Sequence, residues 1–288
     1  MRTKIFKIIL RMGDRKVELR LYCQNTAPAK DTLDVWPALH IIIDHNFLRI
    51  GAGAAATAGT RNIIAALKHN DRVCRIELQC FFTFAFSHLE DLLSVMLVSF
   101  RELTVLQLVA YGVGRVVSIP DSFFGGYAPR LRTLDLDSVP FPGLPKVLLS
   151  ATRLVYLHLF CSLASRYISP EEMFTCLSVL TSLKVVSLQF SGPHFLPIQT
   201  SRRPDRSTLP ALTSFKFRGL SKYMEDLVAR IDAPRLNELI IDFLNTPQLP
   251  QFIGRTPTLE TCNIPARPDY RRVSIRVLAC TSGFLSEC

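Results

Sequence analysis

The chain has 288 residues, of which 48% are hydrophobic, and it carries a formal net charge of +10. This apolar content is enough for a buried core and excludes a chain that is disordered throughout. No apolar run approaches the ~20 residues that a membrane span requires, so we expect no membrane partner.

The positive charge is concentrated in residues 1–20, 199–206 and 255–276, which carry net charges of +5, +2 and +3. Phosphate neutralisation by these basic segments is one hypothesis and would give nucleic-acid binding. No aromatic residues alternate with the arginines, as a stacking platform for bases would need. The pattern therefore favours a solvated basic surface and no nucleic-acid partner.

The eight cysteines form no C-x-x-C pair, and a chain of this length does not need disulfides for stability. Lys7 and Arg11 interrupt the apolar residues near the start, which disfavours a secretory signal. We expect an intracellular protein of the cytoplasm or nucleus.

After a basic N-terminal segment, residues 1–16, two strands are expected in chain order. Val17, Leu19 and Leu21 alternate as in a strand, and residues 36–43 resemble a second one. A helix over residues 62–67 follows. We interpret residues 17–72 as an N-terminal β cap with a first helix.

A short glycine motif lies inside this region. Gly51 and Gly53, followed by Ala56, match G-x-G-x-x-A, and Asp71 lies where a ribose-binding carboxylate would be expected. The alternative function is therefore a dinucleotide-binding enzyme that uses residues 51–56. Against it, residues 44–50 separate the expected strand from the glycines, where the motif needs a tight turn.

One phrase then recurs: two apolar residues three positions apart, followed by a third two positions later. The last two positions point to the same side of a strand, so each copy predicts a buried strand. We expect a leucine-rich-repeat-like solenoid of about eight irregular repeats over residues 73–264, with α/β composition. The copies begin at Val73, Leu103, Leu131, Leu154, Leu183, Leu212, Leu236 and Leu259.

Helices are expected between the strands. Ser169, Pro170 and Glu172 predict a capping box, and Ser87 with Glu90 repeats that pattern. Shorter helices are expected over residues 145–149, 221–231 and 246–253. Residues 265–288 lose the period and are interpreted as an irregular C-terminal tail with one strand over 273–278.

Several segments resemble the repeat region of fungal F-box proteins, over roughly residues 17–260. The resemblance implies a substrate receptor, in which an F-box recruits Skp1 and a cullin ubiquitin ligase while the repeats hold the target. No segment before Trp36 matches the L-P-x-E start of an F-box, so Skp1 is expected as a partner only if an F-box exists outside this chain. The matching segments are 34–39, 62–73, 128–134, 141–145, 167–171, 209–213 and 228–235.

Neither catalysis nor a bound ion is indicated by the motifs. None of the six histidines forms H-E-x-x-H, and His40 and His45 have no cysteine or carboxylate at ligand spacing. There is no G-x-S-x-G and no phosphate-binding loop. We therefore expect no catalytic residue, no metal and no cofactor.

The candidate site is the outward row of the strands, formed by the residues that alternate with the buried ones. Aromatic residues flanked by opposite charges are typical of a protein-binding face. The sequence therefore predicts a non-enzymatic interaction module for an unknown target protein. Its predicted binding residues are Asp135, Asp137, Tyr156, His158, Phe160, Gln189, Lys216 and Arg218.

Overall fold

The computed structural model describes most of the central part of the chain. It covers residues 6–10, 17–22, 30–35, 38–46, 54–80, 85–111, 117–140, 144–161, 168–190, 206–228, 230–243 and 273–278. The strands are β1 (Phe6–Leu10), β2 (Val17–Tyr22), β3 (His40–Asn46), β4 (Val73–Cys80), β5 (Val105–Ala110), β6 (Thr133–Asp137), β7 (Tyr156–Cys161), β8 (Val185–Phe190), β9 (Ser207–Thr208), β10 (Ser214–Gly219), β11 (Ile231–Asp232), β12 (Glu238–Phe243) and β13 (Val273–Leu278). The helices are α1 (Lys30–Val35), α2 (Ala54–Leu67), α3 (Ala85–Val95), α4 (Leu144–Ser150), α5 (Pro170–Ser178), α6 (Ser221–Val228) and a 3-10 turn, η2 (Phe123–Gly126).

Eleven strands form one open sheet whose order follows the chain: β1-β2-β3-β4-β5-β6-β7-β8-β10-β12-β13. The pairs from β2 to β12 are parallel, whereas β1 and β13 add antiparallel strands at the two ends. The short strands β9 and β11 pair with each other in a separate sheet.

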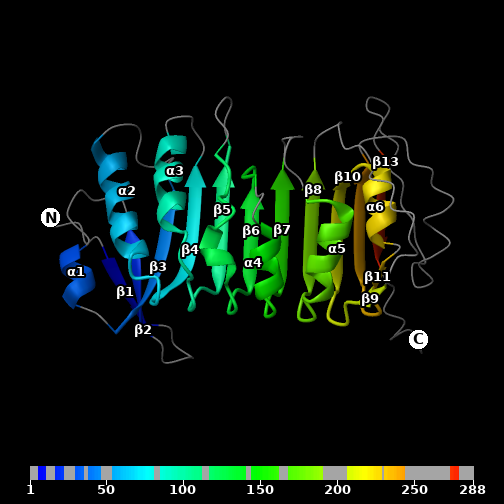
Figure 1. Cartoon of the computed structure of the whole chain (residues 1–288), viewed down its shortest axis with the longest axis horizontal. Coiled ribbons are helices and arrows are strands. Elements are labelled where there is room, and N and C mark those ends of the chain that lie inside the picture. Colours follow the sequence, from blue (N-terminus) through cyan, green and yellow to red (C-terminus); the bar gives the residue numbers. More distant parts are fainter. Residues whose placement is uncertain are drawn as a thin grey trace, which may run out of the picture.

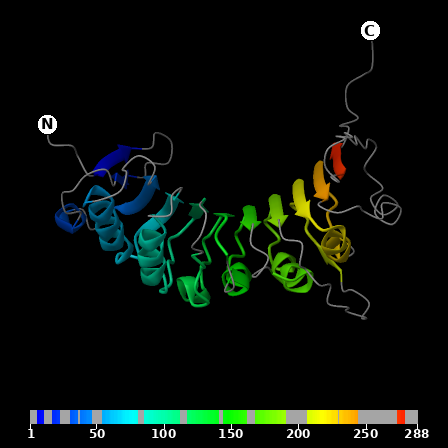
Figure 2. The same ribbon diagram turned by 90° about the horizontal axis from the view of Figure 1, so that it is seen from above.

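The helices cover a single face of this sheet (Figure 1). Seen from above, the sheet lines the inner side of a shallow arc and the helices lie along its outer side (Figure 2). The core lies between the two layers. Consequently the other side of the sheet, which we call the open face, is not covered by any helix of the described residues.

Apolar residues at alternate strand positions build the core. Leu134 and Leu136 on β6, and Leu157 and Leu159 on β7, are fully buried. Each fully buried leucine or isoleucine side chain contributes about 1.5–3 kcal/mol of hydrophobic free energy relative to exposure.

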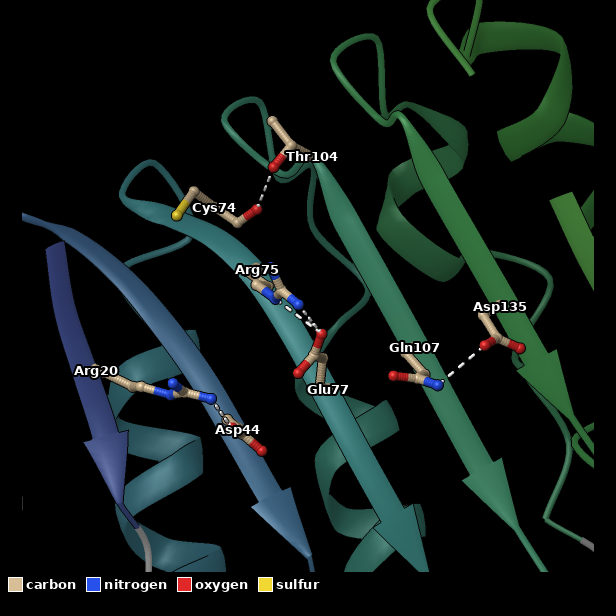
Figure 3. A network of polar contacts seen from close by, with 8 residues as sticks. All are labelled: Arg20, Asp44, Cys74, Arg75, Glu77, Thr104, Gln107 and Asp135. Atoms are coloured by element: carbon tan, nitrogen blue, oxygen red, sulfur yellow. Dashed lines mark hydrogen bonds and ion pairs between the residues drawn. The ribbon is translucent and has the colours of Figure 1, made fainter. Parts of the chain in front are cut away.

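A second regularity holds neighbouring strands in register. The amide of the residue before a strand donates to a carbonyl at or just before the start of the preceding strand, as from Thr104 to Cys74 at 2.8 Å and from Val155 to Arg132 at 2.8 Å. The Thr104 hydroxyl donates to the same Cys74 carbonyl at 2.9 Å (Figure 3). These bonds align the strands so that equivalent side chains form continuous rows.

The expected capping box at α5 is confirmed. The Ser169 hydroxyl accepts from the Glu172 amide at 3.2 Å, and the Glu172 carboxylate accepts from the Ser169 amide at 3.0 Å. The same prediction for Ser87 is wrong, because α3 already begins at Ala85 and Ser87 lies inside it. The helix expected over residues 246–253 lies outside the described residues.

The predicted fold class is wrong. In place of a leucine-rich-repeat-like solenoid of about eight irregular repeats with an N-terminal β cap, the described residues form an α/β structure with one open, mostly parallel sheet. The strands expected to form a cap, β2 and β3, are members of that sheet and pair in parallel with each other and with β4. The eighth phrase, residues 259–264, lies outside the described residues.

The physical reason for this error is that the apolar phrase reports only where buried strands occur and how far apart they are. Parallel strands of any α/β sheet with one covered face produce the same alternation. The phrase therefore located the strands but could not choose the fold class.

Candidate functional site

The open face carries three rows of side chains that run across the strands. These residues alternate along each strand with the buried leucines, and parallel register places them side by side. The middle row holds Gln107, Asp135, His158, Ser187 and Lys216, and the row nearer the carboxyl ends of the strands holds Val109, Asp137, Phe160, Gln189 and Arg218.

Asp135 is a partly buried carboxylate at the centre of this face. Its side chain is 18% exposed, and one oxygen accepts a hydrogen bond of 2.9 Å from Gln107 Nε2. His158 Nε2 lies 4.0 Å from the other oxygen. Burial raises the pKa of Asp135 above its usual value, and the neighbouring Asp137 adds to the rise, while His158 and Gln107 oppose it. The carboxylate is thus partly desolvated.

Asp137 lies two residues further along β6, on the same side. It accepts hydrogen bonds from the hydroxyl of Tyr111 and, at 3.0 Å, from the hydroxyl of Ser138. Burial, and then the bond to Asp137, raise the pKa of Tyr111, so the phenol stays protonated as a donor. Ser138 adopts a left-handed φ of 61°, and its amide donates to the Phe160 carbonyl at 2.8 Å. These contacts fix the end of β6.

Aromatic side chains lie next to both carboxylates. Tyr156 and Phe160 are half-buried on β7, and their register partners on β6 are Thr133 and Asp137. Tyr111 is 41% exposed, directly after β5. Burial, with a smaller contribution from Asp135, raises the pKa of Tyr156. The centre of the face therefore combines aromatic surface with negative charge.

The C-terminal part of the face is basic, and its lysine is paired with a carboxylate of the same chain. Lys216 Nζ lies 3.4 Å from a Glu238 oxygen, which also accepts a hydrogen bond of 2.6 Å from the Ser214 hydroxyl. Arg218 stands between Gln189 and Asp242 in the row. The predicted positive residues are thus on the same face as the acidic ones, with β8 between them.

The N-terminal part of the face is made of ion pairs within the chain. Arg20 on β2 binds Asp44 on the neighbouring strand β3, and Arg75 binds Glu77 within β4 (Figure 3). These pairs neutralise the charge of this part of the face.

All eight predicted binding residues lie on this one face, but the sequence reasoning missed Tyr111. The alternation Val105, Gln107, Val109 continues to residue 111, so extending the pattern by one more step would have included it. Arg20 and Asp44 were missed because they are 24 residues apart and no local pattern connects them.

Gly51 and Gly53 lie outside the described residues, and Ala54 begins α2. Asp71 is exposed in the turn before β4. Over the described strands the sheet order never reverses, so they contain no switch point of the kind at which α/β sheets bind nucleotides. The dinucleotide hypothesis stays a prediction.

His40 and His45 lie in different environments. His40 Nε2 lies 3.8 Å from a Glu102 oxygen at one edge, whereas His45 is only 2% exposed behind the sheet. Burial lowers the pKa of His45 to about 4. Within the described part of the chain, no group of three or more histidine, cysteine or acidic side chains is arranged to hold a metal ion.

Comparison with known proteins does not assign this chain to a family. Neither the protein-family models nor the curated proteins contain a match to this chain. None of the helices among the described residues is both long and apolar enough to cross a lipid bilayer.

Proposed function

We propose that this chain is a non-enzymatic interaction module that binds another protein on the open face of its sheet. The observation that carries the proposal is the row arrangement: aromatic and charged side chains from β5 to β10 lie side by side on a face that no described helix covers. Protein interfaces are enriched in aromatic residues at their centre and have polar rims. The centre at Tyr156 and Phe160 fits that composition.

The finer hypothesis is that the chain is the substrate-binding half of an F-box-type ubiquitin-ligase receptor. It rests on the resemblance of segments such as 128–134 and 209–213 to fungal F-box proteins. Skp1 enters this hypothesis only through an F-box outside the chain. A pull-down with purified Skp1 tests it, and absence of binding by a verified full-length natural protein would remove the ligase role without affecting the proposed binding face.

Site-specific photo-crosslinking tests the binding face itself. A benzoylphenylalanine at position 160 is expected to capture one reproducible protein, which is then purified and bound to the unmodified chain. The matched control places the same probe at Leu149, which is 43% exposed on α4 of the helical face. Capture of the same proteins from both positions, or no direct binding by the purified protein, would contradict the proposal.

A further inference from the structure

The inference drawn here rests on the proposed function and concerns the chemistry of the partner. It starts from how the carboxylates of the open face are neutralised. Asp44, Glu77 and Glu238 each have an arginine or lysine of the same chain within ion-pair distance. Among the described residues, Asp135 and Asp137 have neither an arginine nor a lysine at that distance, and Asp135 has the imidazole of His158, whose Nε2 lies 4.0 Å away.

The hydrogen-bond donors to these two carboxylates carry no positive charge, and the basic side chain beside them among the described residues is His158, 4.0 Å from Asp135. Gln107 donates to Asp135, while Tyr111 and Ser138 donate to Asp137. Such donors satisfy lone pairs but leave the negative charge in place. Asp135 and Asp137 lie on the same side of β6, and Asp135 is partly desolvated. Keeping both carboxylates charged therefore costs free energy unless a cation lies nearby.

The surroundings favour a planar cation. Tyr156 and Phe160 on β7 and Tyr111 after β5 lie on the two sides of β6 and offer aromatic surface beside its carboxylates. A guanidinium group stacks on aromatic rings and binds carboxylates in a bidentate manner, whereas an ammonium group is a compact, strongly hydrated charge.

We infer that the centre of the open face, at Asp135 and Asp137, binds an arginine side chain presented by an extended segment of the partner protein. The argument is charge complementarity: Asp44, Glu77 and Glu238 on other strands of the sheet each pair with an arginine or lysine of the chain, whereas Asp135 and Asp137 have no such partner among the described residues. Arginine inserted there would form a charge-assisted contact beside aromatic rings, which is the composition of interface hot spots.

The test compares two pools of fluorescein-labelled, unstructured peptides that differ only at a fixed central position. One pool carries arginine, and the other carries citrulline, which has the same shape without the charge. We expect the full chain to bind the arginine pool about tenfold more tightly, by fluorescence polarisation at low salt, because charged hydrogen bonds are the stronger ones. A lysine pool is expected to bind with intermediate affinity.

Substitutions on the open face test whether the preference for arginine over citrulline arises there. Asp135→Asn and Asp137→Asn keep the side-chain shape and an acceptor oxygen, and each is expected to reduce the preference for arginine over citrulline. The matched control is Asp91→Asn, an exposed carboxylate of α3 on the helical face, which should leave the preference unchanged. Circular dichroism and the unfolding midpoint confirm that each variant is folded.

The outcomes separate this inference from the proposed function. Equal binding of both pools, or no binding of either, overturns the arginine site while successful crosslinking at position 160 still supports a binding face. A preference for arginine that survives both substitutions also overturns it. Failure of the pools together with failure of the crosslinking contradicts the inference and the proposed function.

Discussion

The two faces of the sheet differ in how their side chains are satisfied. On the covered face, Leu134, Leu157 and Val186 are fully buried against one another and the helices. On the open face, the residues that alternate with them include charged, polar and aromatic side chains. Among the described residues no arginine or lysine pairs with Asp135 or Asp137, and the imidazole of His158 lies 4.0 Å from Asp135. The covered face therefore supplies the apolar core that stabilises the fold, whereas the open face carries polar, charged and aromatic side chains that lie outside this core. Substitutions on the two faces should therefore change different measurements.

The largest expected effect is on the covered face. Leu157→Ala removes a fully buried side chain at the centre of the sheet and should lower the free energy of unfolding by about 2–5 kcal/mol, because a cavity remains. Urea denaturation measures it. The neighbouring open-face substitution Tyr156→Ala is the control, and an equal loss of stability there would remove the distinction between the faces.

The next effect is a dependence of stability on pH that arises from His45 on the covered face of the sheet. Burial lowers the pKa of His45 from 6.5 to about 4, so the folded chain binds fewer protons than the unfolded chain between these values. Stability is therefore complete above pH 6.5 and is lost as the pH falls towards 4, by about 3 kcal/mol at most. His45→Leu should flatten this dependence, and an unchanged slope in denaturation series at several pH values would contradict the assignment.

A smaller effect is expected at the start of α5. Ser169→Ala removes the N-cap acceptor for the Glu172 amide and should lower the free energy of unfolding by ~1 kcal/mol. Ser169→Asp, which retains an acceptor and adds favourable charge at the helix start, is the rescue variant. If alanine and aspartate give the same stability, the capping box does not contribute as described.

The smallest stability change, and opposite in sign, is expected for Asp135→Asn on the open face. Since burial raises the pKa of Asp135 in the folded chain, the folded state holds the proton more tightly than the unfolded state. The charged form is thus disfavoured by folding, and its cost appears as the pH rises through the interval between the two pKa values. At neutral pH the asparagine variant should be at least as stable as the natural chain. A clear loss of stability would mean that Asp135 serves the fold.

Local patterns in the sequence predicted the elements well. The phrase at Leu131 predicted β6, the phrase at Leu154 predicted β7, and the capping residues Ser169 and Glu172 predicted the start of α5. Strand alternation also placed the eight candidate residues on one face. These features depend on neighbours in the chain, so they can be read from spacing.

Features that depend on distant neighbours could not be predicted in this way. The fold class depends on how strands and connections stack, and the burial phrase is shared by several architectures. The pairing of Arg20 with Asp44 and the bond from Tyr111 to Asp137 join residues of different strands. Consequently only the structure shows how the open face is divided, with arginine–carboxylate pairs at its N-terminal end and carboxylates without a described arginine or lysine partner at its centre.

The most direct test of the account compares two double variants for binding to the protein captured at position 160. Tyr156→Ala with Phe160→Ala changes the open face, while Leu149→Ala with Val179→Ala removes exposed apolar side chains on the helical side. The account expects the open-face pair to weaken binding by at least about tenfold, as truncation of interface aromatics does, and the control pair to leave it unchanged. Loss of binding in the helical-side pair with full binding in the open-face pair would contradict it.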